Sequence, residues 1–148
     1  MERLRALIHH ARTNNVRSPF VHGLHGASKS RWVYVAHVLV PKDVTARGAR
    51  IRFVEAGEGA GKTPVLLIHD FLATRDMWTD SFGKLAEKFH VLAPDLPGFG
   101  ASEKPDPERY AYGWDAFAGS LVDLVAAIGL GRIHVCGHGM GGGVAYNA

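Results

Sequence analysis

Short segments of this chain repeat hydrophobic residues with the period of a strand. Residues 31–40 are β-branched and aromatic and predict a strand that ends at Pro41. Residues 50–55 alternate Ile51 and Phe53 with arginines, the pattern of a half-buried strand. Residues 65–68 form a continuous apolar run, typical of a parallel strand covered on both faces. Two further strands are predicted over residues 90–93 and 133–136.

Other segments repeat hydrophobic residues with the spacing of a helix. This spacing predicts an N-terminal amphipathic helix over residues 1–17 and further helices over residues 76–89 and 114–128. Another helix is expected to begin at Gly143, after a turn over residues 137–142. The stretch 94–112 is rich in proline and glycine and predicts a long loop.

Strands that alternate with helices predict the α/β class, with a mostly parallel sheet covered by helices on both faces. The domain organisation predicted from the pattern has three parts. Residues 1–17 form the N-terminal helix, residues 18–43 a connector with the first strand, and residues 44–148 the α/β region.

Composition narrows the function classes. The chain has 148 residues and a formal net charge of +3, and its Lys and Arg residues are scattered, whereas nucleic-acid binding favours a basic stripe. The only cysteine is Cys136, so no internal disulfide can form. No apolar run is long enough for a membrane span or a secretory signal, so a cytoplasmic location is expected.

Two glycine-rich segments resemble nucleotide-binding loops. Residues 56–63 nearly match the phosphate-cradling pattern that ends in Gly-Lys-Thr, but Pro64 and a strand follow where that loop needs a helix. Gly137, Gly139 and Gly142 match the dinucleotide pattern between a strand and a helix. That pattern also needs an acidic residue about 20 positions later, and the sequence stops at Ala148. We therefore expect no nucleotide, cofactor or metal.

The same residues support a different resemblance. The segment IHVCGHGMGG resembles the nucleophile elbow of α/β hydrolases, in which a strand turns sharply into a helix. Upstream, VLLIHDFLATRDMW resembles the end of that family's third strand, and VLAPDLPGFGASEKPDP resembles the loop after its fourth. The resemblance implies the first half of an α/β-hydrolase fold, whose strand order is 1-2-4-3-5-6-7-8. The chain would then be truncated after strand five and the elbow.

The resemblance also implies site residues. The backbone N–H groups of Phe71 and Met140 would form the oxyanion hole, and Gly137 and Gly141 would flank the elbow tip. Gly139 stands at the tip, where the family places Ser, Asp or Cys. Glycine has no atom that can attack a substrate, and loss of the nucleophile lowers the rate of triad enzymes by about six orders of magnitude.

Other residues near this elbow receive less direct interpretations. His69 resembles a buried, hydrogen-bonded family histidine, His138 occupies the variable elbow position, and Cys136 is expected to be buried in its strand. Asp70 replaces a usual glycine. Its carboxylate would either oppose negative charge at the oxyanion hole or turn outward to cap a helix near Thr74.

The sequence therefore predicts a hydrolase-family chain that is catalytically silent, because Gly139 lacks a nucleophile and the triad acid and histidine would lie downstream. Two alternatives remain open: hydrolysis that persists or is complemented by a downstream half, and a non-enzymatic module that binds a small molecule. Self-association is expected through an open strand edge between Ile133 and Cys136.

Overall fold

The computed structural model describes residues 39–59 and 61–148. The helix predicted over residues 1–17, the connector that follows it and residues 31–38 of the first predicted strand lie outside the described residues. Leu39 and Val40, the remaining residues of that strand, do not belong to a strand.

A five-stranded sheet forms the centre of the described part, in the order β1-β2-β4-β3-β5. This is the order expected for the first five strands of an α/β hydrolase. The β3–β4 and β3–β5 pairs are parallel, whereas the β1–β2 and β2–β4 pairs are antiparallel. The sheet is therefore mixed rather than mostly parallel. Its strands are β1 (Lys42–Ala46), β2 (Ala49–Ala56), β3 (Pro64–Ile68), β4 (His90–Pro94) and β5 (His134–Gly137).

The first strand differs from the prediction. The structure has β1 at Lys42–Ala46, after Pro41, and the strand crosses the expected boundary between residues 43 and 44. Arg47 and Gly48 form a two-residue turn into β2 with φ of 49° and 76°, and such a turn matches the twist of a hairpin. The pattern missed β1 because it is an exposed edge strand with mostly polar residues. Cross-strand pairing with Arg52 lowers the pKa of Asp43 to about 2.

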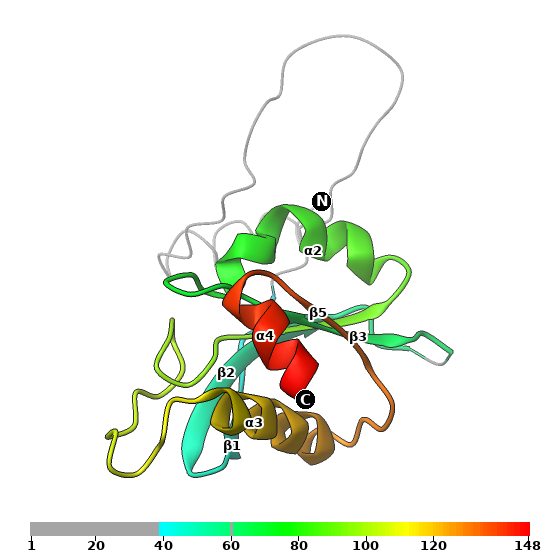
Figure 1. Cartoon of the computed structure of the whole chain (residues 1–148). Helices are drawn as coiled ribbons and strands as arrows, with labels where there is room; N and C mark the ends of the chain where they lie inside the picture. The colour runs from blue at the N-terminus through cyan, green and yellow to red at the C-terminus, as the bar shows by residue number, and fades with distance from the viewer. Residues whose placement is uncertain (1–38, 60) are drawn as a thin grey trace, which may run out of the picture. The chain divides into compact units, whose positions relative to one another are not determined.

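Helices cover both faces of the sheet (Figure 1). The predicted helix over residues 76–89 is a 3-10 turn, η1 (Arg75–Trp78), followed by α2 (Thr79–Ala86). The second predicted helix is α3 (Trp114–Ala127), and the last is α4 (Met140–Asn147), which begins three residues before the expected position. The loop predicted between β4 and α3 contains no helix or strand.

Two hydrophobic cores follow from this layering. On one face, α3 and α4 pack on the sheet through residues such as Leu121, Leu124 and Val144, each at most 1% exposed. On the other face, Phe82 of α2 packs against Leu67 and neighbouring residues of β3 and β4. The strand β3 is packed between the two cores, and this packing fixes the position of the residues that follow Ile68.

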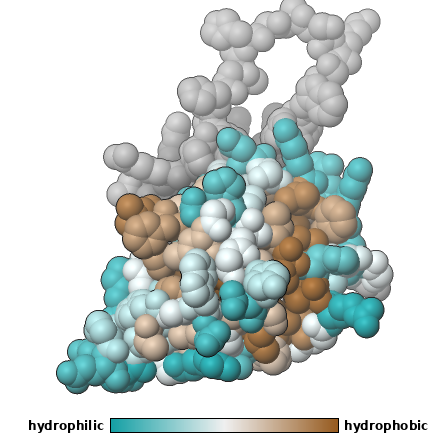
Figure 2. All heavy atoms as spheres, in the orientation of Figure 1, coloured by the Kyte–Doolittle hydropathy of each residue, from teal (hydrophilic) through white to brown (hydrophobic). Residues whose placement is uncertain are grey.

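The strand β5 lies at one edge of the sheet and pairs with β3 alone within the described residues. Cys136 is exposed, so the prediction that it is buried is wrong. Cys136 is exposed because β5 is an edge strand, and its burial would require another element beside it. An apolar groove of about 410 Å³ runs next to β5 and includes Leu66, Leu130 and Val135. Figure 2 shows hydrophobic surface gathered beside α4.

Candidate functional site

The turn between β5 and α4 has the strained geometry of a nucleophile elbow. Gly139, at its tip, has φ of 52° and ψ of −118°. A Cβ atom on Gly137 would lie 2.0 Å from the carbonyl oxygen of Gly141, and one on Gly141 would lie 2.4 Å from that of Ile68. Strand and helix therefore approach too closely here for any side chain at the two flanking positions.

The side chain of Asp70 fills the space above the elbow tip. Its Oδ1 atom accepts hydrogen bonds from the N–H groups of Phe71 and Met140, both at 2.7 Å. These are the two donors expected to form an oxyanion hole. A Cβ atom on Gly139 would lie 2.0 Å from the same Oδ1. The aspartate thus occupies both the anion position and the position that a nucleophile would take.

The two alternatives for Asp70 are resolved by this geometry. Its carboxylate points toward the elbow, and Thr74 caps the 3-10 turn instead, with its side chain accepting from the N–H of Asp76. The N–H groups of Met140 and Phe71 lower the pKa of the Asp70 carboxyl, and His138 contributes from 3.4 Å. The carboxylate is therefore ionised at neutral pH, and its charge is already satisfied by backbone donors.

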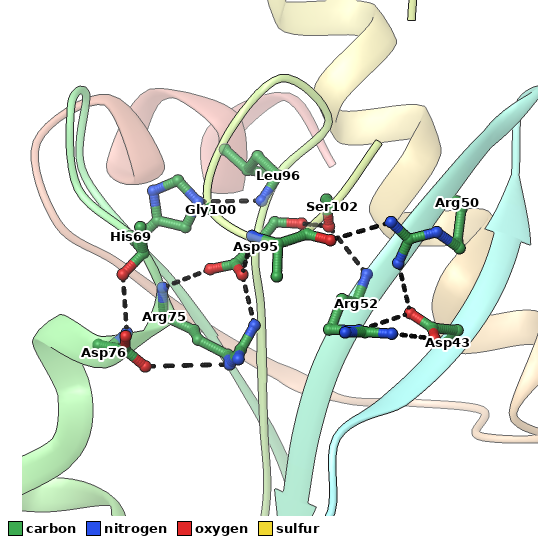
Figure 3. Close-up of polar contacts among 12 residues, drawn as sticks. Asp43, Arg50, Arg52, His69, Arg75, Asp76, Asp95, Leu96, Gly100 and Ser102 are labelled. Atoms are coloured by element: carbon green, nitrogen blue, oxygen red, sulfur yellow. Dashed lines mark hydrogen bonds and ion pairs between the residues drawn. The ribbon is translucent and has the colours of Figure 1, made fainter. Parts of the chain in front are cut away.

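His69 is fully buried at the end of β3. Its Nε2 accepts a hydrogen bond from the N–H of Leu96 at 2.9 Å (Figure 3). Its Nδ1 therefore carries the proton and donates to the carbonyl oxygen of Asp70 at 2.8 Å. Both ring nitrogens are engaged, which leaves no lone pair for proton transfer. The geometry supports a structural role, in which His69 ties the β4 loop to the residue that fills the elbow.

Aromatic rings surround the entrance to this site. Phe99 lies edge-on to both His69 and Phe71, with ring centroids 5.3 and 6.1 Å apart. The Phe71 side chain is exposed. A shallow hollow of about 240 Å³ is lined by Tyr112, Gly113, Trp114, Phe117 and Met140. An apolar group could therefore pack in this hollow against Met140, whose backbone N–H donates to Asp70.

Comparison with known proteins identifies the family. Residues 63–148, more than half of the chain, match the family described as alpha/beta hydrolase fold. The chain belongs to this family. The match includes β3, the residues of the elbow and everything between them, so the geometry above lies within the family's own scaffold.

Several relatives of this α/β hydrolase carry names that state an activity. The chain is 38% identical to epoxide hydrolase A of Mycobacterium tuberculosis over 106 residues, which cover 71% of this chain and 32% of that protein. It is 39% identical to lipase 1 of Psychrobacter immobilis over 101 residues, or 68% of this chain and 31% of the lipase.

Solved structures give the same picture. Epoxide hydrolase A from Mycobacterium thermoresistibile matches 74% of this chain and 34% of its own, with a TM-score of 0.68 and 34% identity. The chain thus spans about a third of the length of the relatives it matches.

A buried carboxylate that the sequence analysis missed holds the loops of this α/β hydrolase together (Figure 3). The Asp95 side chain is 2% exposed and pairs with the guanidinium of Arg75. Its oxygens also accept the backbone N–H groups of Arg75 and Ala101, at 2.7 and 2.9 Å. The hydroxyl of Ser102 bridges the Asp95 carbonyl to the N–H of Arg52. In the sequence, the segment that contains Asp95 contributed only to the family resemblance. The ion pair of Asp95 was not predicted, because its partner Arg75 lies 20 residues upstream in the chain.

One cluster of residues could hold a cation. Glu55, Glu58 and His90 place ligand atoms within 4.8 Å of one another. Lys42 already pairs with both carboxylates, and His90 Nε2 lies 3.0 Å from Glu55. The ammonium group supplies the positive charge that a metal would bring, so this cluster is explained as an ion-pair network.

Two further expectations concern nucleotides and membranes. The connector between β2 and β3 leads into a strand, so it lacks the helix that a phosphate loop requires. Among the described residues, no helix is long and apolar enough to cross a membrane.

Proposed function

We propose that this α/β-hydrolase chain is silent in ester hydrolysis through its elbow. One observation carries the proposal: the Asp70 carboxylate accepts the N–H groups of Phe71 and Met140 beside a tip residue, Gly139, that has no side chain. The scaffold keeps its strained turn, while the nucleophile is missing and the anion position is filled.

Both departures oppose acyl transfer for separate physical reasons. Without a heteroatom at position 139, the elbow forms no covalent intermediate. During ester hydrolysis, negative charge develops on the carbonyl oxygen of the substrate, and backbone N–H donors must stabilise that charge. The N–H groups of Phe71 and Met140 already donate to Asp70, so they are not available to the substrate. The negative charge of Asp70 would repel that oxyanion at short range. A nucleophile at position 139 would therefore still meet the Asp70 carboxylate, and removal of that carboxylate would still leave the elbow without a nucleophile.

An activated-ester assay tests the proposal. We expect the chain to hydrolyse p-nitrophenyl acetate no faster than a heat-denatured sample at the same concentration. Asp70→Asn should give the same result, because it removes the charge without supplying a nucleophile. Turnover that saturates with substrate and disappears on denaturation would contradict the proposal.

The crowding of Asp70 against Gly139 predicts energetic coupling between the two positions. Gly139→Ser places a side chain where the Asp70 carboxylate lies and also strains a residue with φ of 52°, a backbone cost of about 1–3 kcal/mol. In the double variant Asp70→Gly/Gly139→Ser the overlap is gone. We expect the double variant to lose less stability than the sum of the single variants, measured by urea unfolding of all four proteins. Simple additivity would show that the two side chains do not compete for this space.

Self-association is expected through the edge of β5 that no strand of the described residues pairs with, and a second copy of the chain would be the partner. The strand His134–Gly137 has no Lys, Glu or Pro that would discourage edge pairing, and Val135 is 39% exposed beside the apolar groove. We expect the apparent mass in light scattering to rise with concentration, and Val135→Lys to reduce that rise. A wild-type chain that stays monomeric at all concentrations would refute this expectation.

A further inference from the structure

The carboxylate above the elbow has one oxygen that the backbone does not use. Asp70 Oδ1 accepts both backbone N–H groups, whereas Oδ2 lies 3.4 Å from Nδ1 of His138. That distance exceeds the usual range for a hydrogen bond, about 2.7–3.2 Å. It matches the separation of two ligand atoms on one zinc ion, because bonds of about 2.0–2.2 Å at a tetrahedral angle place the two atoms about 3.3–3.5 Å apart.

The thiol of Cys136 belongs to the same face of the sheet edge as His138. The N–H of His138 donates to the carbonyl oxygen of Ile68 at 3.1 Å, so the pairing with β3 continues one residue past the end of β5. Because side chains alternate along a strand, residues two positions apart point to the same face, about 6.6 Å from each other. Zn–S and Zn–N bonds of about 2.3 and 2.0 Å extend the reach of both side chains. One ion can therefore contact the thiolate and the imidazole together.

All three side chains can be reached from solvent. The side chains of His138 and Asp70 are 65% and 35% exposed, and Cys136 is also exposed. Within the described residues, Asp70 forms an ion pair with His138 and with no Lys or Arg side chain. It differs in this from the carboxylates of the ion-pair network between β1, β2 and β4, which an ammonium group already neutralises. The Oδ2 atom of Asp70 is therefore available to a metal ion.

We propose that Cys136, His138 and Asp70 form a binding site for Zn²⁺, with Sγ, Nδ1 and Oδ2 as the ligand atoms. The nitrogen and the oxygen already have the required spacing, and the exposed thiol completes the site by rotation about its χ1 angle. Three protein ligands leave the fourth tetrahedral position to water. Thiolate and imidazole favour zinc over Mg²⁺, which prefers oxygen ligands in an octahedron. This inference goes beyond the proposed function, and it replaces the expectation from the sequence that no metal binds.

A titration with Co²⁺ tests the proposal, because Cys136 is the only cysteine of the chain. A thiolate bound to Co²⁺ gives a charge-transfer absorption band in the near ultraviolet, which histidine and carboxylate ligands alone do not give. We expect the full, reduced chain to develop this band up to one equivalent of Co²⁺. An equivalent of Zn²⁺ should abolish the band, whereas an excess of Mg²⁺ should leave it unchanged. Histidines elsewhere in the chain cannot produce this signal.

Four variants locate the metal. Cys136→Ser should lose the band entirely, because no other thiolate is present. His138→Gln and Asp70→Asn each remove one ligand and should weaken Co²⁺ binding by at least about 10-fold. His134→Gln is the matched control. His134 is exposed and lies on the same face of β5 two residues before Cys136, but it pairs with Val65 at the far end of the strand from Asp70. Its replacement should leave the affinity unchanged.

Each variant is first checked for folding by circular dichroism. The absence of the band in folded wild-type protein would overturn the proposal. So would a band that keeps its affinity in both His138→Gln and Asp70→Asn, because the ion would then not lie between these residues. A band lost in His134→Gln but kept in His138→Gln would assign the metal to another pair of residues and overturn it as well. Ester turnover by metal-free wild-type protein would instead contradict the proposed function, so the two failures are distinguishable.

Discussion

Replacement of Asp95 by alanine should lower the free energy of unfolding by about 3–5 kcal/mol, the usual cost of removing one partner of a buried ion pair. The carboxylate is 2% exposed, and the Arg75 guanidinium paired with it is 16% exposed. Without Asp95, the Arg75 charge is left buried, and the N–H groups of Arg75 and Ala101 lose their acceptor.

The measurement is urea unfolding followed by circular dichroism. Asp95→Asn keeps the shape and one acceptor oxygen, so it should fall between wild type and Asp95→Ala. Asp76→Ala is the matched control, because that exposed carboxylate lies 4.0 Å from Arg75 and should change stability little. A midpoint for Asp95→Ala equal to that of the control would show that the network contributes nothing.

Gly137→Ala is expected to disrupt the elbow. Its Cβ atom would lie 2.0 Å from the Gly141 carbonyl oxygen and 2.5 Å from the Gly142 nitrogen, and both are backbone atoms that no rotamer change can move. The strand and helix must separate, at a cost of about 1–3 kcal/mol or more. The shift should also carry the Met140 N–H away from Asp70.

Gly131→Ala serves as the control, since a Cβ atom there meets nothing within 4 Å. Thermal unfolding of both variants measures the difference, and the amide resonance of Met140 reports whether its hydrogen bond to Asp70 survives. An unchanged melting temperature for Gly137→Ala would mean that the strand and helix do not approach as closely as described.

Some features of the fold followed from local patterns. The strands β2, β3, β4 and β5 and the helix α3 each appeared within two residues of the predicted bounds, because hydrophobic periodicity reports which side of an element faces the core. The glycines around the elbow were equally informative. A backbone position that has no room for a side chain requires glycine, and glycine can be recognised in the sequence without knowledge of the rest of the fold.

Other features were set by partners far apart in the chain. The pattern missed β1 because an exposed edge strand needs no apolar face, and Cys136 looked buried because its exposure depends on what lies beside β5. The antiparallel pairing of β2 with β4 likewise follows from where the chain returns to the sheet, which no single segment specifies.

The residue types at the elbow, and the absence of a nucleophile at Gly139, were determined by the sequence alone. Only the tertiary structure decided where the Asp70 carboxylate goes. One of its two acceptor contacts is with the next residue, Phe71, whereas the other reaches Met140, seventy positions away, and forms because β3 and β5 are neighbours in the sheet. A local sequence pattern shows which chemical groups are present. Whether a carboxylate and a distant backbone N–H group come into contact depends on which strands pair in the sheet.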